Sequence, residues 1–148
     1  MSENILEFTK TELICLDKNT PGIDNFKNQK PEMVSHIKTR ALEDQKTKLG
    51  TTWTWVYDNK IILGYISIAM FSIEKKIVFE QDRSFKSVPY GSIPALLIGQ
   101  LATHENYQGK GIGEFMVLWA IDQAREYSKK IGCRLVMLHP HDDVIGWY

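Results

Sequence analysis

Residues 107–113 read Tyr-Gln-Gly-Lys-Gly-Ile-Gly, and this stretch decides which fold we expect for the chain. It lies between an apolar run at 93–103, typical of a buried strand, and an amphipathic run at 113–131, typical of a helix. Glycines at alternate positions lack Cβ atoms, so the backbone N–H groups of the loop can approach a ligand closely. The following helix directs the positive end of its dipole at the same point. The sequence therefore predicts a loop that holds phosphate oxygens.

The spacing of the glycines excludes three familiar phosphate loops. A Walker loop would need a glycine where His104 stands, and Ser or Thr after the lysine instead of Gly111. A dinucleotide fingerprint would need its third glycine at the position of Glu114. A kinase glycine loop lacks its supporting Asp-Phe-Gly and His-Arg-Asp motifs elsewhere in the chain.

The run from Gln108 to Gly113 fits the pattern Gln/Arg-x-x-Gly-x-Gly/Ala. It resembles the acyl-CoA loop of the GNAT superfamily of N-acyltransferases, and residues 97–103 and 64–68 are similar to two central strands of that superfamily. A narrower resemblance is to the acetyltransferases of toxin–antitoxin pairs, through the Ala-Leu-x-x-Gln segment at 41–45, a Gly-Thr strand region and a Gly-Tyr pair in the third strand. Together these features cover roughly residues 23–148.

The resemblance implies acetyl-CoA as the cosubstrate and implies a set of residues that bind it: Leu101, Ala102, Thr103, Gln108, Gly109, Lys110, Gly111, Ile112 and Gly113. The pantetheine arm would lie along the strand at 101–103, and the loop amides would anchor the pyrophosphate, with Lys110 as a secondary charge. Tyr148 matches the family tyrosine beside the sulfur, and a phenol that is protonated at neutral pH can act as general acid toward the thiolate. Glu105 or His104 would accept the proton of the amine through water, or neither would have a role.

The predicted reaction is direct attack of a primary amine on acetyl-CoA, and the acceptor stays open between an aminoacyl-tRNA, a small amine and a protein amine. The formal net charge of zero argues mildly against tight tRNA binding, whereas a basic patch around the first helix would favour it. We expect tRNA or an antitoxin as possible partners, and a possible homodimer. A non-catalytic CoA-binding or regulatory domain is the alternative from a different class.

Composition supports one compact domain, because 148 residues with 43% hydrophobic content can build a core. Cys15 and Cys133 have no metal or redox spacing, so we expect free thiols, no metal and a cytoplasmic location. No apolar signal core or membrane span is apparent, and no membrane association is expected.

The expected fold class is α/β (α+β), with a GNAT-like mixed central sheet flanked by helices. We predict helices at 31–49 and 113–131 and strands at 51–57, 61–71, 93–103 and 134–138. Residues 77–79 are predicted as a short strand and 142–148 as a final helical turn. GNAT domains usually continue beyond the aromatic-Tyr pair, here Trp147-Tyr148, so we expect a single domain, 1–148, whose C-terminal strands are missing.

Overall fold

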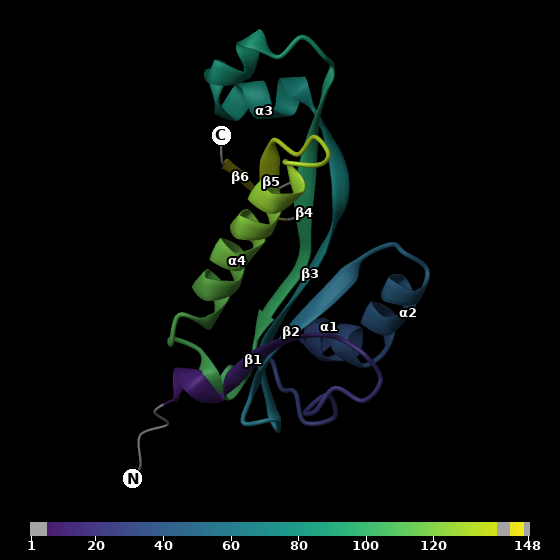
Figure 1. Ribbon diagram of the computed structural model, residues 1–148, viewed down its shortest axis with the longest axis vertical. Helices are drawn as coiled ribbons and strands as arrows, with labels where there is room; N and C mark the ends of the chain where they lie inside the picture. Colours follow the sequence, from purple (N-terminus) through teal and green to yellow (C-terminus); the bar gives the residue numbers. More distant parts are fainter. Residues whose placement is uncertain (1–5, 139–142, 147–148) are drawn as a thin grey trace. The chain divides into compact units, whose positions relative to one another are not determined.

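The computed structural model describes residues 6–138 and 143–146, and the chain divides into two compact units. The first unit holds residues 1–67 and 101–113, and the second holds 68–100 and 114–148. Two long strands contribute to both units, β3 (Ile61–Glu74) and β4 (Ser92–Thr103) (Figure 1).

The strands form one mixed sheet. Hydrogen bonds join six strands in the order β1-β2-β3-β4-β5-β6. Strand β1 (Thr11–Cys15) runs antiparallel to β2 (Thr51–Tyr57), and β5 (Leu135–Leu138) runs parallel to β4. A parallel pair needs a crossover connection, and the helix α4 (Ile112–Tyr127) supplies it between β4 and β5. The predicted mixed sheet is therefore confirmed.

The helical segment of the first unit begins at Pro31, as predicted, because the fixed φ of proline and its missing N–H suit the first turn. It comprises α1 (Pro31–Ser35), the π-helical turn η2 (His36–Arg40) and α2 (Ala41–Lys46). The segment ends at Lys46, three residues before the predicted end at Leu49. The π-helical turn has no counterpart in the sequence prediction.

The core of the first unit connects its helices to the strand that precedes the glycine loop. Its buried members come from η2, α2, strands β2 to β4 and the connection after β1: Leu16, Phe26, Ile37, Ala41, Val56, Ile62, Tyr65 and Ala102. The Tyr65 hydroxyl donates a hydrogen bond to the Met33 carbonyl at 2.7 Å, and burial raises the pKa of this phenol. Ala102 is 5% exposed, so packing fixes the end of β4 where the loop begins.

In the second unit, residues 75–81 form the helix α3 (Lys75–Gln81), and the predicted short strand at 77–79 is wrong. Three consecutive apolar residues suggested a strand, but the structure buries only Val78 of them, in a cluster with Ile73 and Phe85. Ile77 remains 36% exposed on the surface of the helix. Tertiary packing of Val78 thus outweighs the β propensity of the segment.

Residues 143–146 form the strand β6 (Asp143–Gly146), so the predicted helical turn at 142–148 is wrong over these four positions. The strand pairs antiparallel with β5 in the register Leu135–Gly146 to Leu138–Asp143. Strand β5 therefore has a hydrogen-bonded neighbour on each side, β4 and β6. The edge of β5 that faces away from β4 is therefore covered by β6.

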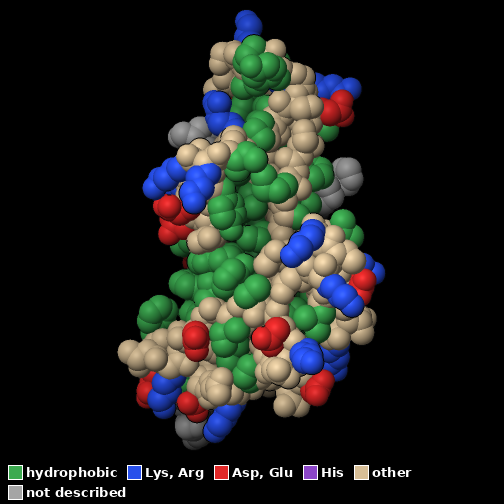
Figure 2. Space-filling model, turned by 45° about the vertical axis from the view of Figure 1, so that its right-hand side comes forward, with side chains coloured by type: hydrophobic (Ala, Val, Ile, Leu, Met, Phe, Trp, Pro, Cys, Tyr) green, Lys and Arg blue, Asp and Glu red, His purple; other side chains and the backbone are tan. Residues whose placement is uncertain are grey.

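The surface carries both signs of charge. On the face shown in Figure 2, basic and acidic side chains are interspersed with hydrophobic ones, in keeping with a formal net charge of zero. Within the described part of the chain, no helix combines the length and the apolar character that crossing a membrane requires.

Candidate functional site

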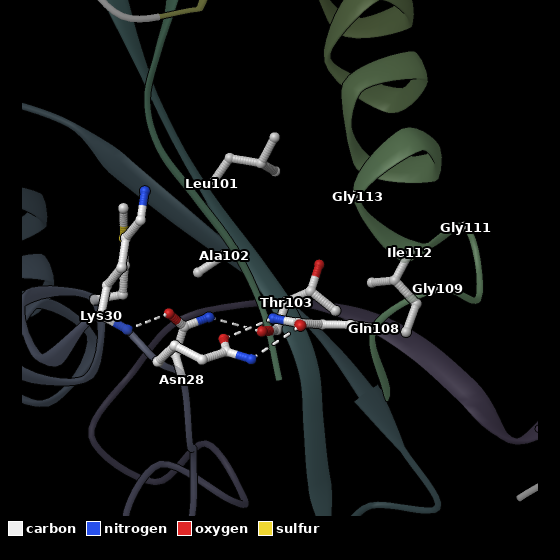
Figure 3. A pocket seen from close by; sticks show the side chains of 12 residues that line it. Asn28, Lys30, Leu101, Ala102, Thr103, Gln108, Gly109, Gly111, Ile112 and Gly113 are labelled. Atoms are coloured by element: carbon white, nitrogen blue, oxygen red, sulfur yellow. Dashed lines mark hydrogen bonds between the residues drawn. The ribbon is translucent and has the colours of Figure 1, made fainter. Parts of the chain in front are cut away.

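A cavity of about 400 Å³ opens in the first unit beside the glycine loop (Figure 3). Its walls come from the end of β4, from the loop with the first residues of α4, and from a segment that precedes and enters α1. The lining residues are Asn28, Gln29, Lys30, Met33, Leu101, Ala102, Thr103, Gln108, Gly109, Gly111, Ile112 and Gly113.

The cavity brings together the residues that the sequence predicted for the acyl donor, with the exception of Lys110. The side chain of Lys110 is exposed and does not line the cavity. Among the lining residues, Lys30 alone has a charged side chain, and it enters from the opposite wall (Figure 3). Lys30 is therefore the cation that lines this cavity, and a role for Lys110 beside a bound phosphate stays a prediction.

The glycine loop adopts a backbone that requires glycine at two positions. Gly109 and Gly111 have φ values of 80° and 81°, in the left-handed region that other residues rarely adopt. A Cβ atom at either position would meet no protein atom within 4 Å. The space in front of both residues is open, and successive N–H groups in such a conformation form a concavity for anions.

Gly113 differs from the two loop glycines. Its φ lies outside the left-handed region, and an added Cβ would lie 3.7 Å from Thr103 Oγ1, which is an ordinary contact. Ile112 begins α4 and is 3% exposed, so its side chain anchors the helix start in the first unit. The first N–H groups of α4, a helix of 16 residues, therefore lie at the loop and the cavity.

The wall opposite the loop was not predicted from the sequence. Asn28 Nδ2 donates to the Thr103 carbonyl at 2.8 Å, and the Glu105 N–H donates to the Lys27 carbonyl at 2.9 Å. The side-chain amides of Gln29 and Gln108 donate to each other, at 3.1 and 2.9 Å. These contacts join residues 75 to 79 positions apart, so the only sequence signal was a polar, turn-rich stretch before Pro31.

Of the residues predicted for proton transfer, Glu105 and His104 lie in the described part of the chain, and neither lines the cavity. Glu105 is exposed in the short 3₁₀ turn η4 (Glu105–Tyr107) and is not among the lining residues. His104 is 5% exposed, and its Nδ1 accepts the Asn106 N–H at 3.1 Å, so the ring has a structural role. Tyr148 lies outside the described residues. In the described part of the chain, no group of three or more His, Cys, Asp or Glu residues could hold a metal ion.

The stability of the protein should depend on pH through His104. Burial lowers the pKa of this imidazole below its ordinary value of 6.5, so the folded state binds fewer protons than the unfolded state in that range. Stability should be complete above pH about 6.5 and decrease as the pH falls through the lowered pKa. Urea unfolding at pH 7.5 and 5.5 measures this change, which should be smaller in a His104→Gln variant. An equal change in both proteins would contradict the prediction.

Comparisons with known proteins agree with this geometry. The family model described as Acetyltransferase (GNAT) family matches residues 20–148. A tRNA-acetylating toxin of Mycobacterium tuberculosis (strain ATCC 25618 / H37Rv) is 22% identical over 127 residues, which cover 85% of this chain and 74% of the toxin.

Solved structures show the same fold. AtaT complexed with acetyl-methionyl-tRNAfMet superposes with a TM-score of 0.78 at 18% identity, covering 86% of this chain and 76% of that one. A variant of the AtaT toxin bound to the C-terminus of the antitoxin AtaR and acetyl-CoA gives a TM-score of 0.70 at 16% identity, with coverages of 87% and 74%. AtaT has thus been solved with acetyl-methionyl-tRNAfMet, and a variant of it with acetyl-CoA and the C-terminus of its antitoxin.

Proposed function

This chain belongs to the acetyltransferase (GNAT) family and is an acetyl-CoA-dependent acetyltransferase, and we propose that its acceptor is the amino group of an aminoacyl-tRNA. The observation that carries the proposal is that the first unit contains both the glycine-loop cavity and a basic segment that begins beside it. The likeness to a tRNA-acetylating toxin and to AtaT supports the same acceptor.

The cavity has the features that an acyl-CoA requires. The loop amides from Gln108 to Gly113 and the start of α4 suit the pyrophosphate, because unpaired N–H groups and the helix dipole both favour anions. The strand end at 101–103 offers main-chain groups to the amides of the pantetheine arm. Lys30 adds one positive charge to the same cavity.

The proposed reaction is a direct transfer. The neutral amine attacks the thioester carbonyl carbon, a C–N bond forms, and the C–S bond breaks to release coenzyme A. The amine loses one proton, and the thiolate gains one. We propose that the phenol of Tyr148 donates the proton that the thiolate gains. Glu105 is the candidate that accepts, through water, the proton that the amine loses. A main-chain N–H of β4 beside the carbonyl would stabilise the oxyanion.

The basic segment is the part of the first unit that suits a nucleic-acid acceptor. Between residues 27 and 48, the exposed cationic side chains are Lys27, Lys30, Lys38, Arg40, Lys46 and Lys48, against the acidic residues Glu32, Glu43 and Asp44. Arg40 is partly neutralised by Asp44, whose Oδ1 lies 2.6 Å from Nη2. The excess of positive charge offers contacts to phosphates although the whole chain is neutral.

A labelled-acetyl assay tests the acceptor. The enzyme is incubated with acetyl-labelled acetyl-CoA and one of three acceptors: an aminoacyl-tRNA, the same tRNA without its amino acid, or the free amino acid. Label should enter the aminoacyl-tRNA alone, and the rate should fall as salt rises because phosphate contacts are screened. Equal transfer to the free amino acid, or none to the aminoacyl-tRNA, would contradict the proposal.

An antitoxin and a second copy of the chain are two predicted partners that stay predictions. An antitoxin partner is supported by the likeness to AtaT, which has been solved with the C-terminus of AtaR. The homodimer likewise stays a prediction.

A further inference from the structure

The end of β4 has one face of its backbone turned away from β3. The His104 N–H donates to the Leu63 carbonyl on β3 at 2.8 Å. Because main-chain groups of successive strand residues point to opposite sides, those of Leu101 and Thr103 point away from β3. Among the described residues, the pairing of β4 with β5 runs as far as Ile98 and Leu138, whereas β4 continues to Thr103. This edge borders the cavity.

One acceptor on that edge is already occupied by a side chain. Asn28 Nδ2 donates to the Thr103 carbonyl at 2.8 Å, while Asn28 Oδ1 accepts the Lys30 N–H at 2.9 Å. Both bonds are drawn in Figure 3, where Asn28 lies between Lys30 and the strand. A side chain that reaches a strand carbonyl 75 residues away holds its own segment against that strand. The second bond fixes the turn from which Lys30 enters the cavity.

We propose that Asn28 is a positioning residue for the acyl donor: by donating to the Thr103 carbonyl it holds the 28–30 turn against β4, so that the cavity wall beside the pantetheine arm is in place before the donor binds. The proposal rests on the proposed use of this cavity for acetyl-CoA. Without the Asn28 bond the donor would have to order this turn on binding, whereas a wall that is already in place avoids that cost.

The role concerns only the pantetheine half of the donor. The nucleotide half is assigned to the glycine loop and the start of α4, to which Asn28 makes no hydrogen bond among the described residues. Loss of the Asn28 side chain should therefore weaken the binding of acetyl-CoA much more than the binding of adenosine 3′,5′-bisphosphate, which lacks pantetheine. A general collapse of the cavity would weaken the binding of both ligands to a similar extent.

The test measures both ligands by calorimetry in wild type and three variants. Asn28→Leu keeps the shape without the amide. Asn28→Ser keeps a hydroxyl that can accept the Lys30 N–H but is too short to reach Thr103. Gln29→Met is the matched control, because it removes a neighbouring cavity-lining amide that contacts Gln108 and not Thr103. Thermal melting of each variant checks that the fold is retained.

We expect Asn28→Leu and Asn28→Ser each to weaken acetyl-CoA binding about 5- to 10-fold, the loss typical of one hydrogen bond, with less than about a twofold change for the bisphosphate. In Gln29→Met, the ratio of the two affinities should stay at the wild-type value. Wild-type affinity for acetyl-CoA in Asn28→Ser, or equal losses for both ligands in either Asn28 variant, would overturn the proposal. Failure of the wild-type protein to bind acetyl-CoA would instead contradict the proposed use of the cavity, on which this role rests.

Discussion

Replacement of Gly111 by aspartate should lower the affinity for acetyl-CoA more than about 100-fold, or about 2.7 kcal/mol. Gly111 has a φ of 81°, and its backbone faces the open side of the cavity. An aspartate there would place a carboxylate where the pyrophosphate is expected, and like charges repel strongly in a site that is partly closed to water. Calorimetric titration with acetyl-CoA measures the loss.

The fold should survive this change. A Cβ at Gly111 meets no protein atom within 4 Å, so the cost is the left-handed backbone alone, about 1–2 kcal/mol. Gly113→Ala is the matched control, because its Cβ makes only an ordinary contact with Thr103 and its φ is not left-handed. The control should bind acetyl-CoA within about threefold of wild type, since one extra methyl in ordinary contact strains nothing. Unchanged affinity in Gly111→Asp would show that the phosphates lie elsewhere.

Replacement of Tyr148 by phenylalanine should lower kcat about 100-fold and leave the KM for acetyl-CoA nearly unchanged. A positioned general acid typically contributes 10²- to 10⁴-fold, and phenylalanine keeps the ring while removing the proton donor. A loss confined to kcat indicates an interaction made in the transition state and not in donor binding. Steady-state thiol release with an aminoacyl-tRNA acceptor measures both parameters.

The matched control is Tyr90→Phe, which removes a hydroxyl from a tyrosine that is 72% exposed in the second unit. It should have wild-type kinetics. If Tyr148→Phe retains full kcat, another group or solvent protonates the thiolate. If both variants lose activity equally, the effect of Tyr148→Phe is not specific to proton transfer.

The loop half of the cavity could be predicted from sequence because its chemistry is local. Alternate glycines followed by an amphipathic helix specify backbone conformation and helix start within seven residues. Two of the three glycines then adopt left-handed φ, and the predicted strand end lines the same cavity. The side chain of Lys110 is exposed and does not line the cavity, so its predicted contact with phosphate stays a prediction.

The wall formed by Asn28, Gln29, Lys30 and Met33 could not be predicted, since each contact depends on a distant partner. Nothing in the local pattern around Asn28 indicates that its amide reaches Thr103, 75 residues later. The fold also contains features that are local in sequence and could be predicted, and features that depend on distant contacts and could not. Pro31 marks the start of the predicted helix correctly, because its effect on the backbone is local. The apolar run at 77–79 misleads, because burial of Val78 beside Phe85 decides its conformation.

Amide hydrogen exchange with and without acetyl-CoA tests most directly the claim that this cavity holds the acyl donor. Binding should slow exchange in two separate segments, 28–33 and 101–113, because their backbones form the two walls of the cavity. Exchange around α3, beside a second cavity of about 480 Å³ lined by Glu74, Lys76 and Phe79, should not change. Unchanged exchange at 101–113 under saturating acetyl-CoA, or slowing only around α3, would contradict the account.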